Sequence, residues 1–245
     1  LGFEIFDRKG RSAHLNRKGH QVLLQAQELL RLYDNLGCGT AELATNVLVN
    51  IGAIASVQRS CLREALARFH QQCPQCRTRV LPGLSMELVN LVDAGEIDMA
   101  AIIRPPFSLQ SDLRWTTLTL EPYRLIVARE VPGEDWATLL SSLPFIRYDR
   151  ASFGGRQVDR FLRQMHFTVR EVCELDELEA IIKLVENGVG VALVPQTSAH
   201  DWPAGVRALD LGQHTFHRDI GLVHRSGQSL TEPVRTLAQL IAEQA

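Results

Sequence analysis

The chain has 245 residues, of which 26 are basic and 28 acidic, giving a formal net charge of -2, and 45% are hydrophobic. These values are ordinary for a globular protein, and the overall charge indicates neither a nucleic-acid nor a membrane partner. Five cysteines in a chain of this length do not form the pattern of a disulfide-stabilised secreted domain. We also find no secretory signal and no apolar stretch long enough to span a membrane, so we expect a cytoplasmic protein without membrane contacts.

Residues 1–16 predict two short extended segments around a charged turn that contains Arg8, Lys9 and Arg11. The side chain of Asn16 is suited to cap a helix that begins directly after it. This local excess of positive charge stands out in an otherwise balanced chain. It is either a solvated surface or a contact surface for an anionic partner.

A helix is predicted for residues 17–36, because apolar side chains recur there at steps of three and four. The stripe consists of Val22, Leu23, Ala26, Leu29, Leu30, Tyr33 and Leu36. A stripe of this length must be buried, either on the body of the protein or against a second copy of itself. The second arrangement would make the protein a homodimer.

From residue 45 onward, predicted strands alternate with predicted helices, which indicates α/β units with a largely parallel sheet. Strands are expected at residues 47–54, 77–81, 98–103, 115–128, 144–148, 168–175, 190–194 and 216–224. Helices are expected at residues 57–72, 85–94, 155–164, 176–187 and 232–243. The elements form two similar series with one helix left over, so we expect two lobes, the last helix returning to the first.

Three turns that follow predicted strands carry serines, at Ser56, at Ser85 and at Ser152 with the adjacent Phe153. Ligands of open parallel sheets bind beyond the carboxyl ends of the strands, where helix N-termini favour anions. Serine at a helix start is also a common cap, so each position alone has a purely structural explanation. Together the turns predict a cleft between the lobes that holds a small carboxylate.

Three further residues are candidates for the same cleft. Arg104 directly follows a predicted strand, where it either pairs with an anion or is solvated. Asp176 is expected to cap the helix that follows it, and Pro195 ends the last strand of the second series. We expect all three to lie near the bound ligand.

The sequence contains few motifs that would indicate an enzyme or a metal-binding protein. The sequence lacks the nucleophile, phosphate-binding, metalloprotease and dinucleotide motifs that such chemistry requires. His70, Cys73 and Cys76 have a spacing compatible with zinc or a dithiol, but half the ligands of a structural zinc site are missing. We expect neither a cofactor nor a catalytic residue.

Several segments resemble LysR-type bacterial transcriptional regulators. Residues 1–8 (LGFEIFDR) and 15–19 (LNRKG) are similar to the end of the third helix and the wing of that family's winged helix-turn-helix, with Asn16 in place of the usual threonine. Residues 83–103 and 185–195 (VENGVGVALVP) resemble two motifs of the family's effector-binding domain. The resemblance extends over essentially the whole chain.

The resemblance implies a DNA-binding regulator switched by a small effector, expected to be an anion. It implies four regions, namely a wing remnant at 1–16, a linker helix and hinge at 17–44, a first lobe at 45–126 and 225–245, and a second lobe at 127–224. The lobes would form an effector-binding domain of the type 2 periplasmic-binding-protein kind, and the linker helix would join a homodimer that is often part of a tetramer.

The resemblance also implies roles for single residues. It places effector contacts at Ser56, Ser85 and the loop of Ser152 and Phe153, and phosphate contacts at the basic turn of residues 8–11. The recognition helix of the family would precede Leu1, so we expect this chain alone to bind operator DNA weakly. The alternative is a periplasmic-type solute-binding protein of a transporter, for which residues 1–36 would have no use.

Overall fold

The computed structural model describes residues 2–9, 12–16, 47–197, 202–226 and 230–245, together with 18, 19, 21–23, 25, 26 and 29. Strands β1 (Phe6–Lys9) and β2 (Ser12–Leu15) form the predicted antiparallel hairpin. The described residues between 18 and 29 are helical, and the Gly19 N–H donates to Oδ1 of Asn16 at 2.9 Å. This contact confirms the predicted helix cap.

Much of the predicted basic turn and of the predicted linker helix lies outside the described residues. Arg11 and most of the predicted helix 17–36 belong to this part, and for Arg8 and Lys9 the structure describes the backbone only. The dimer through the linker helix and the phosphate contacts therefore stay predictions.

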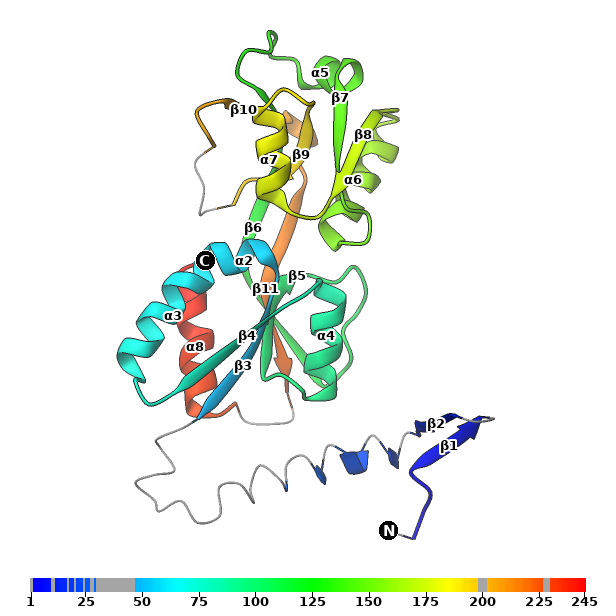
Figure 1. Cartoon of the computed structure of the whole chain (residues 1–245), viewed down its shortest axis with the longest axis vertical. Coiled ribbons are helices and arrows are strands. Elements are labelled where there is room, and N and C mark those ends of the chain that lie inside the picture. Colours follow the sequence, from blue (N-terminus) through cyan, green and yellow to red (C-terminus); the bar gives the residue numbers. More distant parts are fainter. Residues whose placement is uncertain are drawn as a thin grey trace.

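The first lobe is built on a mixed sheet with the strand order β4-β3-β5-β11-β6 (Figure 1). Strand β3 (Leu48–Ala53) is parallel to β4 (Arg77–Pro82) and β5 (Met99–Ile103). Strand β11 (His217–Arg225) runs antiparallel to both β5 and β6 (Leu113–Ala128). The central strands are buried on both faces, which explains their continuous apolar sequences.

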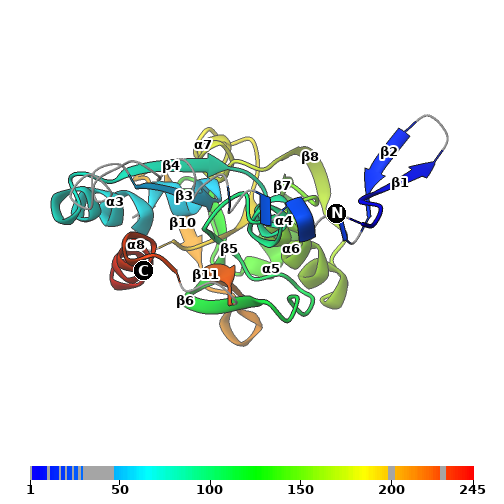
Figure 2. The same ribbon diagram turned by 90° about the horizontal axis from the view of Figure 1, so that it is seen from below.

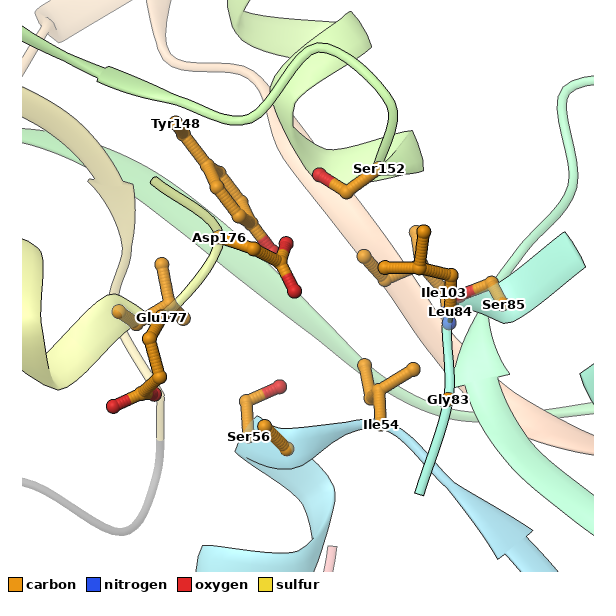
Figure 3. Close-up of a pocket in the computed structure, with 12 residues that line it drawn as sticks. Ile54, Ser56, Gly83, Leu84, Ser85, Ile103, Tyr148, Ser152, Asp176 and Glu177 are labelled. Atoms are coloured by element: carbon orange, nitrogen blue, oxygen red, sulfur yellow. Dashed lines mark hydrogen bonds between the residues drawn. The ribbon is translucent and has the colours of Figure 1, made fainter. Parts of the chain in front are cut away.

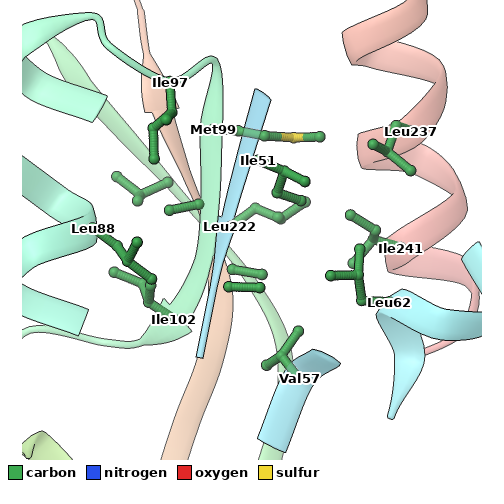
Figure 4. Packing of buried hydrophobic residues seen from close by; sticks show 14 of the residues in the cluster. Ile51, Val57, Leu62, Leu88, Ile97, Met99, Ile102, Leu222, Leu237 and Ile241 are labelled. Atoms are coloured by element: carbon green, nitrogen blue, oxygen red, sulfur yellow. The ribbon is translucent and has the colours of Figure 1, made fainter. Parts of the chain in front are cut away.

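Helices cover both faces of this sheet. Helix α4 (Ser85–Ala94) packs on one face through Leu88, and α3 (Cys61–Gln72) and α8 (Glu232–Glu243) pack side by side on the other (Figure 4). Leu237 and Ile241 of α8 are completely buried in the core of the first lobe. The predicted return of the last helix is therefore confirmed.

The second lobe contains the C-terminal half of β6, flanked by β9 (Ala192–Pro195) and β10 (Val206–Leu209). Strands β7 (Pro144–Tyr148) and β8 (Arg170–Leu175) are parallel, and a bridge between Phe145 and Val191 links them to the segment before β9. The helices are α5 (Trp136–Ser142), α6 (Phe153–Gln164), α7 (Leu178–Glu186) and the short η1 (Gly212–His214). Helix α5 and strand β10 were not predicted.

Two long strands connect the lobes. Leu113 of β6 packs in the first core, whereas Tyr123 and Leu125 of the same strand pack in the second. On β11, Ile220 and Leu222 belong to the first core. The two-lobed α/β architecture is confirmed. The residue boundaries of the lobes remain a prediction. The chain passes from the first lobe to the second in β6 and returns in β11. We place this return near the start of β11 rather than at residue 225.

One predicted helix is interrupted. Residues 57–72 were expected to form a single helix, but the structure has α2 (Ala55–Arg59) and α3, separated at Ser60. Ser60 has φ -105° and ψ -120°, outside the helical region. The short α2 lies on the side of the first lobe that faces the second lobe (Figure 1). Among the described residues, no helix is long and apolar enough to cross a membrane.

Candidate functional site

An open pocket of about 380 Å³ lies between the two lobes (Figure 3). The first lobe contributes the start of α2, the turn before α4 and the end of β5, and the second contributes the ends of β7 and β8 and the starts of α6 and α7. The polar lining residues are Ser56, Ser85, Tyr148, Ser152, Asp176 and Glu177. Four of the residues predicted for the effector cleft thus come together in one pocket.

Ser56 and Ser85 present hydroxyl groups whose protons are free to donate. The Ser56 Oγ accepts a hydrogen bond from Nη2 of Arg218 at 3.0 Å, and the Ser85 Oγ accepts one from the N–H of Ile103 at 3.2 Å. A hydroxyl has one donor and two acceptor positions, so each serine keeps its own proton for a ligand. Ser85 is also the first residue of α4, where the helix dipole favours an anion.

Neither of these two serines is the cap that local sequence suggested. The residue before α2 is Ile54 and the residue before α4 is Leu84. Ser56 and Ser85 lie inside the first turns of their helices instead. Their hydroxyls therefore have no capping role and are available for a ligand or for tertiary contacts.

Ser152 differs from the other two serines because its hydroxyl is already used. Its Oγ donates to the carbonyl oxygen of Asp149 at 2.8 Å and accepts from the N–H of Gly155 at 3.0 Å. This is the predicted cap of α6. Ser152 lines the pocket, but its main task is to hold the start of the helix.

The turn at Ser152 fits closely against the end of β7. A Cβ added to Gly155 would lie 1.9 Å from the carbonyl oxygen of Asp149, so only glycine fits there. The hydroxyl of Tyr123, on the connecting strand β6, donates to the carbonyl oxygen of Gly154 at 3.1 Å. Burial raises the pKa values of Tyr123 and Tyr148, which keeps both phenols neutral at physiological pH.

A buried ion pair lies behind Ser56. Arg218 is completely buried, and its Nε donates to Oε2 of Glu121, which lies directly opposite on β6. Its Nη1 has no hydrogen-bond partner among the described residues. Arg218 therefore carries a paired charge behind the pocket and contacts the pocket through Ser56, where β11 and β6 cross between the lobes.

Asp176 brings negative charge to the pocket. Its carboxylate points into the space between Ser56 and Ser152 (Figure 3). Burial, followed by the nearby charges of Asp149 and Glu177, raises its pKa above the ordinary value. The prediction that Asp176 caps a helix was wrong: α7 begins at Leu178, its cap position is Glu177, and no side chain caps it.

A second pocket, of about 420 Å³, adjoins the first and shares Ser56, Glu177 and Leu178 with it. Its other lining residues are Arg59, Glu179, Ile182, Pro195, Thr197 and Trp202. Arg59 of the first lobe forms ion pairs with Glu177 at 2.9 Å and Glu179 at 2.6 Å. These ion pairs bridge the lobes beside the first pocket.

Three predicted residues do not line the first pocket. Arg104 pairs with Asp219 at 3.1 Å and lies over the ring of Trp115, with its side chain 59% exposed. Phe153 is buried against Phe107 and belongs to the core of the first lobe, although it comes from the second. Pro195 lines the second pocket only.

Sequence reasoning missed Tyr148, Glu177 and Arg218. Tyr148 and Glu177 follow the rule that ligand contacts lie at the carboxyl ends of strands, so this rule alone would have included them. Arg218 lies within an antiparallel strand, and its burial depends on a partner 97 positions away. No local pattern would have identified it.

His70, which the sequence offered as a candidate zinc ligand, lies close to a hydroxyl group. Its Nε2 is 3.0 Å from the hydroxyl oxygen of Thr78.

Comparison with known proteins identifies this fold. The model of the LysR substrate binding domain family matches residues 46–245. The uncharacterized HTH-type transcriptional regulator YybE of Bacillus subtilis (strain 168) is 21% identical over 98% of this chain and 84% of YybE. The HTH-type transcriptional regulator IlvR of Caulobacter vibrioides is 26% identical over 99% of this chain and 84% of IlvR.

A solved structure of similar fold is the effector-binding domain of QuiR in complex with shikimate. It superposes with a TM-score of 0.68 at 14% identity and covers 81% of this chain and 96% of the QuiR chain. The relatives are transcriptional regulators, not enzymes or transport proteins. The chain therefore belongs to the LysR substrate-binding domain family and carries the effector-binding domain of a LysR-type transcriptional regulator.

Proposed function

We propose that the pocket between the lobes binds the small-molecule effector of this regulator, with an anionic group of the effector against Ser56 and Ser85. The observation that carries the proposal is that both serines accept a hydrogen bond from the protein and so keep a free hydroxyl proton. The N-terminus of α4 adds positive potential at Ser85, and Arg218 holds the hydroxyl of Ser56 in place.

The regulatory output follows from the position of the pocket. Because the pocket has walls from both lobes, an effector that contacts both favours one relative arrangement of the lobes over others. In our proposal this change reaches operator DNA through a homodimer formed by the linker helix 17–36, with Arg8, Lys9 and Arg11 near the phosphates. Such a regulator acts in the cytoplasm, where two homodimers assemble into a tetramer in our proposal.

The binding site is tested by measuring effector affinity in serine variants. A screen of small organic acids by thermal shift supplies the probe, since an acid at a hundred times its Kd stabilises by about 2.7 kcal/mol. We expect Ser56→Ala and Ser85→Val to weaken binding of that acid about tenfold or more, because each loses a hydrogen bond to a charged group. Calorimetry gives the Kd independently of any change in stability.

Ser60→Ala is the matched control, because Ser60 lies one turn beyond Ser56 and does not line the pocket. Its affinity should equal that of the unaltered protein. If Ser56→Ala and Ser85→Val both bind the acid as tightly as Ser60→Ala does, the effector does not bind at this pocket.

A further inference from the structure

The carboxylate of Asp176 is the unbalanced charge of the pocket. It has no hydrogen bond or ion pair with any described residue, although it points into the space that a ligand would fill (Figure 3). Its raised pKa has burial as its largest cause, and the negative Asp149 and Glu177 outweigh the attraction of Arg218. Asp176 is nevertheless exposed as a residue, so its carboxylate is accessible to a ligand in the pocket.

The other charges near the pocket already have partners. Arg218 pairs with Glu121, and Arg59 pairs with both Glu177 and Glu179. Asp149 accepts a hydrogen bond from the N–H of Ala151 at 2.9 Å. An effector with only a carboxylate would thus bring a second negative charge next to Asp176, with no new cation to offset it.

Stabilisation of the N-terminus of α7 does not explain why an acidic residue stands at position 176. Acidic residues near a helix N-terminus are favourable, but Glu177 and Glu179 already supply that charge in this turn. The Asp176 carboxylate points toward the first lobe and the pocket, whereas that of Glu177 points away from this space (Figure 3). This orientation places the Asp176 carboxylate within reach of a ligand in the pocket.

Building on the proposed function above, we propose that the effector is a small zwitterion of the amino-acid class. Its ammonium group pairs with Asp176, and its carboxylate accepts hydrogen bonds from Ser56 and Ser85. The two ends of the pocket match such a molecule, since the acidic group comes from the second lobe and the hydroxyl donors come from the first. A zwitterion would therefore connect the lobes through opposite charges.

This assignment also accounts for the donors in the pocket. An ammonium group has three donors and a carboxylate has several acceptor positions, so both ends require complementary partners. Asp176 offers only acceptors when ionised, and Ser56 and Ser85 have one free proton each. Arg218 holds the Ser56 hydroxyl in place by donating a hydrogen bond to its oxygen.

The experiment compares amino acids with the same molecules lacking the amino group, by calorimetry on the whole chain. The genetically encoded amino acids are screened first, and pairs such as leucine with 4-methylpentanoate and phenylalanine with 3-phenylpropanoate follow. We expect an amino acid to bind and its deaminated partner to bind about ten- to a hundredfold more weakly, as expected for loss of a charge-assisted hydrogen bond.

Asp176→Asn then tests the residue itself. We expect it to lower the affinity for the amino acid about tenfold or more and to leave the deaminated acid bound as well as before or better. The variant should fold, because Asp176 has no partner among the described residues to lose. Glu130→Gln, in an exposed turn outside both pockets, is the control for removing a carboxylate.

Failure of this inference is distinguishable from failure of the proposed function. If deaminated acids bind, are weakened by Ser85→Val and are unaffected by Asp176→Asn, and amino acids bind no better, the pocket is the effector site and the zwitterion is wrong. If no encoded amino acid binds at millimolar concentration, the assignment is likewise overturned. If no pocket variant changes the binding of any probe, both proposals fall.

Discussion

At the scale of single residues, the ion pair of Glu121 and Arg218 carries a high desolvation cost. Both side chains are buried, and they face each other across the two strands that connect the lobes. Burying two charges is costly, and their attraction offsets the cost only while both partners are present. The ion pair therefore ties the stability of the crossing to the chemistry of the pocket, because Arg218 also holds Ser56.

We expect Glu121→Gln to lower the free energy of unfolding by about 3–5 kcal/mol, because it leaves the guanidinium of Arg218 buried without its counter-charge. Urea unfolding followed by circular dichroism measures the change. The double variant Glu121→Gln with Arg218→Met should recover a large part of the loss. A double variant less stable than Glu121→Gln alone would contradict this account.

The sequence predicted the three serines of the pocket and Asp176, but not the charge pairing around them. Ser56, Ser85 and Ser152 each follow a strand in a recognisable strand–turn–helix pattern, so their convergence followed from the fold. The partnership of Arg218 with Glu121 joins residues far apart in sequence. The unpaired state of Asp176 is a property of the folded surroundings. Neither has a local signature.

At the scale of elements, the start of α6 shows how a helix cap and a pocket wall are combined. Ser152 uses its hydroxyl for the Asp149 carbonyl oxygen and the Gly155 N–H, and Gly155 lies against the backbone of Asp149. The turn is thereby fixed by contacts within the chain. It gives the pocket a rigid wall and leaves hydrogen bonding to a ligand to other residues.

We expect Ser152→Ala to destabilise the protein by about 1 kcal/mol, the usual cost of losing a serine cap, with little change in effector affinity. Chemical denaturation gives the first quantity and calorimetry with the bound probe gives the second. Ser142→Ala is a suitable reference, because the Ser142 hydroxyl donates to a carbonyl oxygen within α5 and does not cap it. A large loss of affinity for Ser152→Ala would show that its hydroxyl contacts the ligand.

The elements missed by prediction are short. Helix α5 has seven residues and β10 has four, too few for a hydrophobic period to emerge. A capping signal for α5 was present, since Asp135 accepts from the N–H of Thr138. Strand β10 pairs only with the second half of β6, so its existence depends on the tertiary fold. Longer elements such as α4 and α8 were predicted with the correct bounds.

At the scale of the whole molecule, the relative position of the lobes depends on few contacts. The strands β6 and β11 pass between them, Phe153 reaches from the second lobe into the core of the first, and Arg59 pairs with Glu177 and Glu179. The ion pairs of Arg59 are well exposed, so their contribution to stability is small. They are suited to bias the arrangement of the lobes without locking it.

We expect Arg59→Ala to change the free energy of unfolding by at most about 1 kcal/mol, and by less in high salt. The lobes should separate further on average, which small-angle X-ray scattering detects as a larger radius of gyration. Arg63→Ala is the control, since among the described residues Arg63 forms an ion pair only with its neighbour Glu64. An unchanged radius of gyration for Arg59→Ala would show that the ion pairs do not hold the lobes together.

The path of the chain through the two lobes has a consequence for the order in which they are made. Strand β11 lies between β5 and β6 in the first sheet, and α8 completes the first core, yet both come from residues 217–243. On the ribosome, the first lobe thus emerges first but lacks a central strand and a covering helix. The second lobe has all its strands beforehand, so it is the part able to fold first, while the first lobe waits for the C-terminal segment.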